Sequence, residues 1–432
     1  MRRLAPLRTS TVVIFGVLAF FLLWWIPFSH VLPDVVPLRF APYRTLEASQ
    51  VAVWVIVAVG LNILTGFNGQ ISLGHGAFVA IGAYTAAILM VDHGWPFWTT
   101  IIAGGVLAGG VGFLVGVPAL RLTGPYLAMA TLGLALATPQ VLSKYEGLTH
   151  GNQGINVRPE VPPPPAFIKD WFGLSLSRDE WMWFLVLSIV LIMLVLALNI
   201  VRSRIGRAFV AIRDSEIAAQ AMGISVPRYK TMAFAISAFY AGVAGGTYAL
   251  VHEYIAPENF NITMSMNLLT TIVIGGLASI LGSVLGAIGL VVVPELPELV
   301  FNRIPGVNIP VELSWAFYGV VLILIMIFAP YGLAGLFHRS VRWVSSWTLR
   351  SRAGILVGLV VGVATTMVVG FALGLVAFLV TTAWVWAPPL VGVGARGYSR
   401  WIGALTSPLA SAGETEAGPE DQSSQDHPDA ER

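Results

Sequence analysis

RSRIGRAFVAIRDSEIAAQAMGISVPRYK, residues 202–230, is a polar segment between two long apolar stretches, and it indicates how the whole chain is organised. Basic side chains at both of its ends mark the cytoplasmic side of a membrane, since Lys and Arg near the ends of spans are retained inside. Its Ala-rich centre, with apolar residues at helical spacing, predicts one helix from Ile205 to Met222. Gly223 is the predicted stop, because glycine tolerates the left-handed geometry that closes a helix. A short amphipathic helix at this place indicates docking onto another protein.

The composition is that of a membrane protein with many spans. Of the 432 residues, 56% are hydrophobic and 11% are charged, and the mean hydropathy is +0.79. Soluble domains usually carry about twice that charged share. The net charge of +2, without a separate basic domain or arm, argues against a nucleic-acid partner. With no Cys and only scattered His, neither a disulfide nor a metal site is expected.

Runs of about 20 apolar residues, the length that crosses a bilayer as a helix, predict the spans. The predicted spans are 11–32, 47–65, 70–91, 97–117, 124–143, 180–201, 228–251, 265–293, 312–329 and 353–391. The first run follows a basic N-terminus and is interpreted as a span entered from the cytoplasm, with a cleaved signal peptide as the alternative. Alternation then places 144–179 outside and 202–227 inside, as the arginines of that segment require.

The segment 265–293 decides the rest of the topology. If it crosses once, the basic cluster between His338 and Arg352 falls outside, against the rule that positive charge stays inside. If it breaks at Gly275-Gly276 or at Gly282-Ser283 and folds as a hairpin of half-spans, the cluster falls inside. The hairpin is therefore the preferred prediction. Irregular backbone at membrane depth is tolerated only where protein or a watery cavity satisfies it, so the break is also a candidate wall of a transport path.

Three parts are expected along the chain. Residues 1–340 form the main transmembrane domain, residues 341–400 add further C-terminal membrane segments, and residues 401–432 form a tail. The apolar stretch 353–391 is too long for one ordinary crossing, so two packed spans are expected there. The tail is acidic and low in apolar residues, a composition typical of disorder.

No clear Asp, Glu, Lys or Arg lies inside a predicted span. A charge at mid-membrane costs at least about 2.5 kcal/mol, a cost that ion-coupled carriers usually accept at a coupling site. The sequence therefore argues against an ion-coupled carrier and against an intramembrane acid–base enzyme. No GxxxxGK[ST] loop occurs either, so ATP that drives transport must be hydrolysed by a different polypeptide.

Neutral polar residues in the predicted spans are the candidates for a translocation path. They are Asn62, Asn68, Gln70, Ser72 and His75 in one Gly-rich run, with Thr131, Asn267, Thr270 and Thr271 further along. The run 61–78 is open to two interpretations, a pore-lining bend or tight helix packing, and its residue types alone favour packing. His75 is expected to be a hydrogen-bonded packing residue rather than a proton relay. The Asn267 group lines a path or joins helices through hydrogen bonds.

Several long blocks resemble the LivM-type permeases, the inner-membrane subunits of branched-chain amino acid ABC importers. The blocks are Asn62–Phe78, GPYLAMATLG at 124–133, LTHGNQGI at 148–155, Ser203–Gly246 and TIVIGGLASILGSVLGA at 271–287. They stand in the order of the family and cover about residues 10 to 340. Two features depart from it: the chain continues beyond the usual end of the family, and His150 stands where the loop motif commonly has Gly.

The resemblance implies an all-α, polytopic membrane helix bundle with the ABC importer permease fold, broken or half-span helices, and a cytoplasmic coupling helix at about 205–223. It implies a path for branched-chain or related hydrophobic amino acids in a bacterial inner membrane. The alternative is a partner-independent channel or facilitator for a small neutral solute such as urea or an amide. The implied partners are two ABC ATPase subunits that use ATP and Mg, a second homologous permease, an extracytoplasmic substrate-binding protein and membrane lipid.

The resemblance also assigns roles within the coupling helix. Four charged residues would face or flank the groove of the ATPase, and small or apolar residues would pack into it. The charged residues are Arg207, Arg213, Asp214 and Glu216, and the others are Ala218, Ala219 and Met222, with Gly223 closing the helix.

Overall fold

The computed structural model describes residues 43–301 except 121, 123 and 159–177, together with short pieces between 319 and 339. The predicted spans 11–32 and 353–391, the C-terminal segments within 341–400 and the tail 401–432 lie outside the described residues. In the described part of the chain, 5 helices are long and apolar enough to cross a membrane.

The long helices follow the predicted spans closely. The predictions that began at 47, 97, 124, 180 and 228 are confirmed by α2 (Tyr43–Asn62), α4 (Phe97–Ala119), α5 (Pro125–Lys144), α8 (Arg178–Arg202) and α11 (Val226–His252). The predicted span 70–91 is shorter in the structure. α2 runs on into a π-helical turn, η2 (Ile63–Phe67), and α3 (His75–Val91) begins only after the non-helical residues 68–74.

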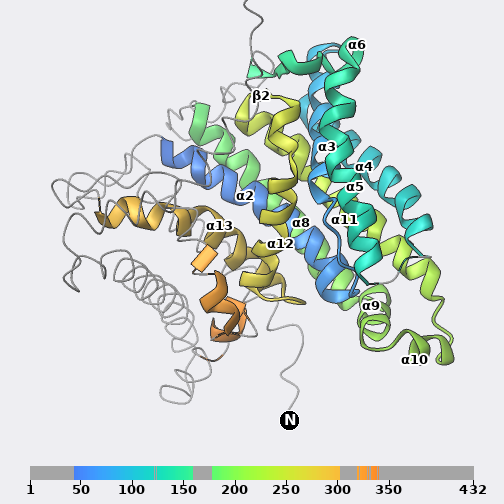
Figure 1. Ribbon diagram of the computed structural model, residues 1–432. Helices are drawn as coiled ribbons and strands as arrows, with labels where there is room; N and C mark the ends of the chain where they lie inside the picture. The colour runs from blue at the N-terminus through green and yellow to red at the C-terminus, as the bar shows by residue number, and fades with distance from the viewer. Residues whose placement is uncertain are drawn as a thin grey trace, which may run out of the picture. The chain divides into compact units, whose positions relative to one another are not determined.

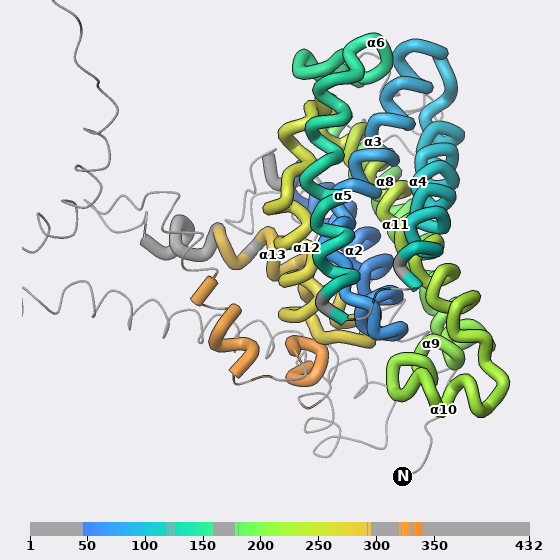
Figure 2. The backbone as a smooth tube through the Cα atoms, turned by 45° about the vertical axis from the view of Figure 1, so that its right-hand side comes forward, coloured from blue at the N-terminus to red at the C-terminus, as the bar shows by residue number. Residues whose placement is uncertain are grey.

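Shorter elements lie at two opposite ends of the bundle. Figure 2 shows α6 (Glu146–Thr149) at one end, and α9 (Arg204–Asp214) and α10 (Glu216–Ala221) at the other. We call these the α6 end and the α10 end. The chain continues from α6 through η3 (Gly151–Gln153) to β1 (Ile155–Asn156), and β1 pairs antiparallel with β2 (Tyr254–Ile255), which precedes η5 (Pro257–Phe260). Strands of two residues are too short to leave a periodic signal in the sequence, so neither was predicted.

His150 ends α6 in the left-handed conformation, with φ 60° and ψ 14°. Glycine adopts this conformation at no steric cost, which explains physically why glycine suits this place in the loop.

α11 lies at the centre of the packing, against α2, α3 and α4 (Figure 1). Close approach depends on three glycines, one on each of three helices: Gly82 on α3, Gly104 on α4 and Gly242 on α11. A Cβ atom on Gly82 would fall on the backbone of Gly242, and one on Gly104 would meet the carbonyl oxygen of Gly82. Small residues that let helix backbones touch are the usual means of packing helices in a membrane. Packing is therefore one role of the many glycines in this chain.

The predicted break is confirmed, and of the two candidate positions it falls at Gly275-Gly276, not at Gly282-Ser283, which lies within a helix. α12 (Ile262–Gly275) ends there, Gly276 has φ 119°, and α13 (Ile280–Phe301) runs back beside α12. The antiparallel pairing is tight, since a Cβ atom on Gly275 would meet Gly282 and one on Gly286 would meet the carbonyl of Thr271. The segment predicted as 265–293 is thus two helices joined by a short irregular turn, not one crossing.

The prediction of one continuous helix from Ile205 to Met222 is wrong. α9 and α10 are separated at Ser215, which has extended backbone geometry and whose side chain accepts a hydrogen bond from the N–H of Ala218. Serine is favoured at the N-cap of a helix because its hydroxyl accepts a hydrogen bond from a backbone N–H group that has no partner within the helix. Gly223 does close the segment, with φ 79°.

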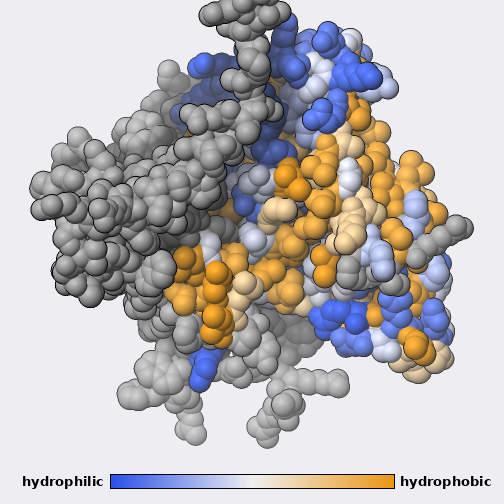
Figure 3. Space-filling model, in the orientation of Figure 1, coloured by the Kyte–Doolittle hydropathy of each residue, from blue (hydrophilic) through white to orange (hydrophobic). Residues whose placement is uncertain are grey.

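The face that carries α3, α4 and α5 shows a broad hydrophobic area between hydrophilic ends (Figure 3). Large apolar side chains of α4 and α5 are exposed, among them Trp98, Ile102, Val106, Leu114, Tyr126 and Met129. Exposed apolar surface of this extent is what lipid contact requires, and it agrees with a multi-pass membrane protein.

Gly82→Ala tests the glycine contacts. The added methyl group meets the backbone of Gly242, so we expect the free energy of unfolding in detergent to fall by about 1–3 kcal/mol, the usual cost of overpacking. Gly110→Ala is the control, because Gly110 is an exposed glycine of α4 and no atom of the described residues lies within 4 Å of its Cβ position. Equal thermal and denaturant unfolding of the two variants would contradict the packing role.

Candidate functional site

The surface of α10 carries two apolar side chains in an otherwise polar setting. Ile217 is 83% exposed and Met222 is 82% exposed, whereas Ala219 is only 3% exposed. Ala219 packs inside the chain against Ile212 and Val226. Ala218 is exposed beside the first two. The apolar residues exposed along α10 and its C-cap are Ile217, Ala218, Ala221 and Met222, whereas Ala219 anchors α10 to its own chain.

Arg213 joins α9 to the turn at the end of α2. Its Nη1 donates to the carbonyl oxygen of Gly66 at 3.0 Å, and its Nε and Nη2 donate to Asp214 Oδ1 at 3.2 and 3.0 Å. Gly69, with φ 79°, lies against Arg213, since a Cβ atom there would be 2.9 Å from Arg213 Cγ. The guanidinium thus connects two residues that are 147 positions apart in the chain. The same group also pairs with the carboxylate of Asp214, the next residue in the sequence.

A second link runs from α10 to the same turn. Glu216 Oε1 lies 2.5 Å from Lys230 Nζ, and Lys230 is largely buried. The carbonyl of Lys230 accepts a hydrogen bond from Gln70 Nε2 at 3.3 Å, and the carbonyl of Gln70 accepts one from Thr65 Oγ1 at 3.0 Å. Residues 65–70 therefore receive contacts from both α9 and the region of α10. Arg207 is not part of these links, because its guanidinium bonds the carbonyl of Arg202.

Asn62 lies one helical turn before Gly66 and holds the connection between α12 and α13. Its Nδ2 is 3.3 Å from the carbonyl of Gly276 and 2.9 Å from that of Ser279. The same nitrogen lies 2.8 Å from Ser283 Oγ. Its Oδ1 accepts the N–H of Ala278 at 2.9 Å. One buried amide thus satisfies polar groups that the broken helix leaves without helical partners.

Gly66 sits where Asn62 and this connection meet. A Cβ atom on Gly66 would collide with Asn62 Oδ1 and with the backbone nitrogen of Ala278. Glycine at position 66 is therefore required for the amide to reach the broken helix, while its carbonyl remains available to Arg213. The resulting series of contacts, which we call the polar seam, runs from Arg213 through Gly66 and Asn62 to the turn at Gly276.

His75 belongs to a directed chain of hydrogen bonds. Ser237 Oγ donates to the carbonyl of Gly60 at 2.7 Å and so accepts from His75 Nε2, which lies 2.6 Å away. With the ring proton on Nε2, Nδ1 accepts from Ser72 Oγ at 3.2 Å. Both ring nitrogens are thereby used, and the arrangement fits a neutral imidazole. His75 makes packing contacts that join α3, α11 and α2, as the packing interpretation expects.

The other predicted path residues lie in different surroundings. Thr131 on α5 accepts the N–H of Leu73 at 3.0 Å, so it meets the turn that contains Ser72. Thr270 and Thr271 both bond the carbonyl of Asn267 within α12. Asn68 is buried, and within the described part of the chain neither its Nδ2 nor its Oδ1 has a hydrogen-bond partner. Asn62 and Gln70 come together with the coupling residues, whereas the Asn267 group stays apart from them. That any of these predicted residues lines a translocation path stays a prediction.

Sequence reasoning missed Lys230, Ser237 and Ser283 as site residues. Lys230 was read only as a flanking positive charge, and the two serines look like ordinary small residues in apolar helices. Their partners are distant in sequence: Ser237 bonds residues 162 and 177 positions away, and Ser283 bonds one 221 positions away. A short-range pattern carries no signal for such contacts.

The comparisons with known proteins agree with one another. The model of a family described as "Branched-chain amino acid transport system / permease component" matches residues 46–326. The chain is 36% identical over 305 residues to the high-affinity branched-chain amino acid transport system permease protein LivM of Escherichia coli K12, a match that covers 66% of this chain and 68% of that protein. It is 26% identical over 301 residues to the permease protein LivH of the same organism, covering 65% of this chain and 91% of that protein. No solved structure matches the chain.

Asn62→Ala tests the polar seam. Removal of the amide leaves the buried groups at 276–279 unpaired, so we expect the free energy of unfolding to fall by about 1–3 kcal/mol. Amide hydrogen exchange should accelerate at residues 276–283 and not along α4. Asn199→Ala, which changes an exposed amide of α8, is the control. Unchanged exchange at 276–283 would contradict the structural role of Asn62.

Proposed function

The chain belongs to the family of permease components of branched-chain amino acid transport systems, and from this we propose how it works in an importer. It is the membrane-spanning permease subunit of an ATP-driven importer, and it forms the translocation path for branched-chain or related hydrophobic amino acids. The observation that supports coupling to separate ATPase subunits is the exposed apolar face of α10, fixed to the bundle by Arg213 and Lys230.

The α10 end faces the cytoplasm in this proposal, and the α6 end faces the outside. The basic residues of the segment 202–230 support this orientation, because positive charge near span ends is retained inside. If the predicted span 11–32 crosses once, this orientation is consistent with an N-terminus in the cytoplasm. The membrane proposed, from the family, is the plasma membrane of a bacterium.

The proposed partners are two ATPase subunits, a second related permease and a substrate-binding protein on the outer side. Two differently named permease proteins of E. coli, LivM and LivH, carry the same transport-system name, which supports a pair of permeases. ATP and Mg are used by the ATPase subunits and not by this chain, which acts as a transport subunit without catalysis of its own.

The polar seam gives the proposal a physical route for coupling. A movement of α10 relative to the bundle acts on Arg213 and on the Glu216–Lys230 pair, and both meet residues 65–70. Asn62 stands next to that turn and holds the connection at Gly276. The turn between α12 and α13 is the least regular part of this route, so it is where a small displacement can change access.

The double variant Ile217→Asp, Met222→Asp tests the docking surface. Two charges in place of the exposed apolar side chains should prevent burial against an ATPase groove. We expect co-purification with the ATPase subunits to fall at least about tenfold, and ATP-dependent uptake to fall with it. Gln220→Ala, on the same helix and exposed, is the control. Full association and uptake by the double variant would refute the docking role of α10.

Arg213→Gln tests the coupling route separately from docking. Because Arg213 bonds the turn at Gly66, its loss should leave the ATPase subunits bound but lower substrate-stimulated ATP hydrolysis and uptake severalfold. Arg204→Gln removes a neighbouring exposed positive charge of α9 and is the matched control. If both variants lose uptake equally, or if Arg213→Gln keeps normal uptake, the route through Gly66 is wrong.

A further inference from the structure

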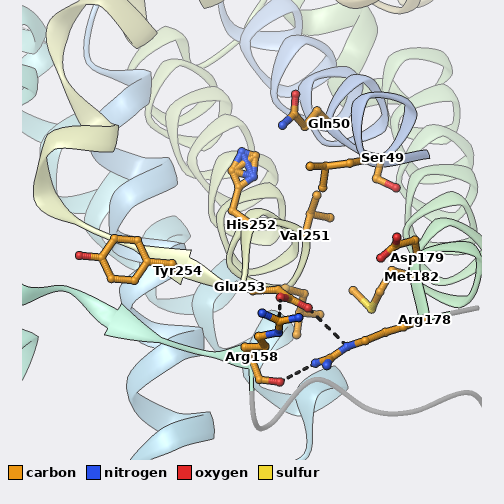
Figure 4. A pocket seen from close by; sticks show the side chains of 12 residues that line it. Ser49, Gln50, Arg158, Arg178, Asp179, Met182, Val251, His252, Glu253 and Tyr254 are labelled. Atoms are coloured by element: carbon orange, nitrogen blue, oxygen red, sulfur yellow. Dashed lines mark hydrogen bonds and ion pairs between the residues drawn. The ribbon is translucent and has the colours of Figure 1, made fainter. Parts of the chain in front are cut away.

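A hollow of about 660 Å³ opens at the end of the bundle opposite α10. It lies between the first turns of α2 and α8 and the last turn of α11, with Arg158 and Tyr254 at its rim. Figure 4 shows these side chains around one opening. The volume falls within the range of about 300–1,000 Å³ that is usual for sites that bind small molecules. In the proposed orientation this hollow faces the side from which substrate arrives.

Two guanidinium groups share one carboxylate at this hollow. Glu253 Oε2 lies 3.2 Å from Arg158 Nε, and Glu253 Oε1 lies 3.3 Å from Arg178 Nε. Arg178 Nη2 also donates to the carbonyl of Arg158. Among the described residues, the cluster holds two guanidinium groups and one carboxylate, so one positive charge has no carboxylate partner there. Guanidinium groups held in this way are suited to a further carboxylate, which they can bind with two parallel hydrogen bonds.

The backbone fixes this cluster. Glu253 has φ 57°, a left-handed conformation that non-glycine residues rarely adopt. It is held there because its carbonyl accepts the N–H of Val157 at 2.8 Å, next to the pairing of β1 with β2. The Glu253 side chain is 28% exposed, so it is held at the surface of the hollow rather than free in solvent. The position of the charges is therefore set before a ligand arrives.

A negative charge stands on the same hollow, apart from the cluster. Asp179, in the first turn of α8, is exposed and forms no ion pair within the described part of the chain. Figure 4 shows Asp179 and Met182 on α8, on the same opening as Arg178 and Glu253. The lining also includes buried apolar side chains, Met182, Leu250 and Val251. Within the described part of the chain, one hollow thus combines a positive charge without a carboxylate, a negative charge without an ion pair, and an apolar surface.

We propose that this hollow is an entry site for a zwitterionic aliphatic α-amino acid. The α-carboxylate binds the guanidinium groups of Arg178 and Arg158, the α-ammonium group binds Asp179, and the aliphatic side chain lies on Met182, Leu250 and Val251. The inference rests on the proposed function, because an importer needs a place where substrate first meets the permease. It also selects among substrates, since urea or another uncharged solute offers neither charge to these groups.

Binding at this site is expected to be weak. The hollow is open, and the Arg158 side chain is 70% exposed, so its ion pairs are screened by water. Weak binding suits an entry site, because a substrate that is held tightly there does not move on.

The test measures binding to the full-length chain in lipid nanodiscs by saturation-transfer NMR, which detects weak ligands without a substrate-binding protein. The probes are L-leucine, leucinamide without the carboxylate, 2-hydroxyisocaproate without the ammonium group, and urea. We expect L-leucine to bind most tightly and urea not to bind. Asp179→Asn should weaken L-leucine roughly fivefold and leave 2-hydroxyisocaproate unchanged, because that probe lacks the group that Asp179 holds.

Arg178→Gln should give the reverse pattern, with L-leucine and 2-hydroxyisocaproate weakened and leucinamide unchanged. Asp179→Asn keeps the test decisive even if Arg178→Gln fails to fold, because Asp179 pairs with no other residue in the described ranges. Glu146→Gln, an exposed charge in α6 outside the hollow, is the control. Absence of L-leucine binding to the unmutated chain, or equal losses for every probe, overturns the entry site.

Transport is measured in parallel with the reconstituted importer, which keeps this inference distinct from the proposed function. ATP-driven uptake of L-leucine with no binding at the hollow refutes the entry site alone. Absence of uptake of any branched-chain amino acid, with ATPase and binding protein present, refutes the proposed function instead.

Discussion

The amide of Asn62 is the interaction on which the rest of the structure depends. A helix that breaks inside a membrane leaves N–H and C=O groups that water cannot reach, and each unpaired group is costly. Asn62 satisfies groups on both sides of the break, from Gly276 to Ser283. Because Gly66 has no side chain, the amide can reach them. Without this contact the antiparallel pair of α12 and α13 would lack a stable turn.

The same turn is where the bundle meets α9 and α10. Arg213 binds the carbonyl of Gly66, and Lys230 connects Glu216 to Gln70. These contacts are polar and few, while the packing of α11 against α3 and α4 is made of close backbone contacts. Close-packed glycine contacts resist displacement, whereas a small set of hydrogen bonds can exchange partners at modest cost. Asn68 is buried in this turn, and its amide has no hydrogen-bond partner among the described residues.

Much of the fold could be predicted from the sequence, because hydropathy and glycine pairs act locally. The spans at α2, α4, α5, α8 and α11 and the break at Gly275-Gly276 follow from such signals. The division at Ser215 was missed because apolar residues continue at helical spacing across it, and Ile212 and Ala219 do share one small core. For the candidate site, the sequence indicates the exposed surface of α10. It does not indicate how α9 and α10 are attached to the bundle, because the hydrogen bond between Arg213 and Gly66 joins residues that are far apart in the chain.

The two ends of the described bundle differ in how they use charge. At the α10 end, charged groups such as Arg213 and Lys230 bind the chain's own backbone or neighbours. At the opposite end, Arg158, Arg178 and Asp179 line a hollow and retain the capacity to bind more. Charged side chains are tolerated at both ends because water screens them there, whereas in the membrane interior each would cost several kcal/mol. A carrier of zwitterions can therefore select by charge at its entrance and must rely on neutral groups, such as backbone carbonyls and hydroxyls, beyond it.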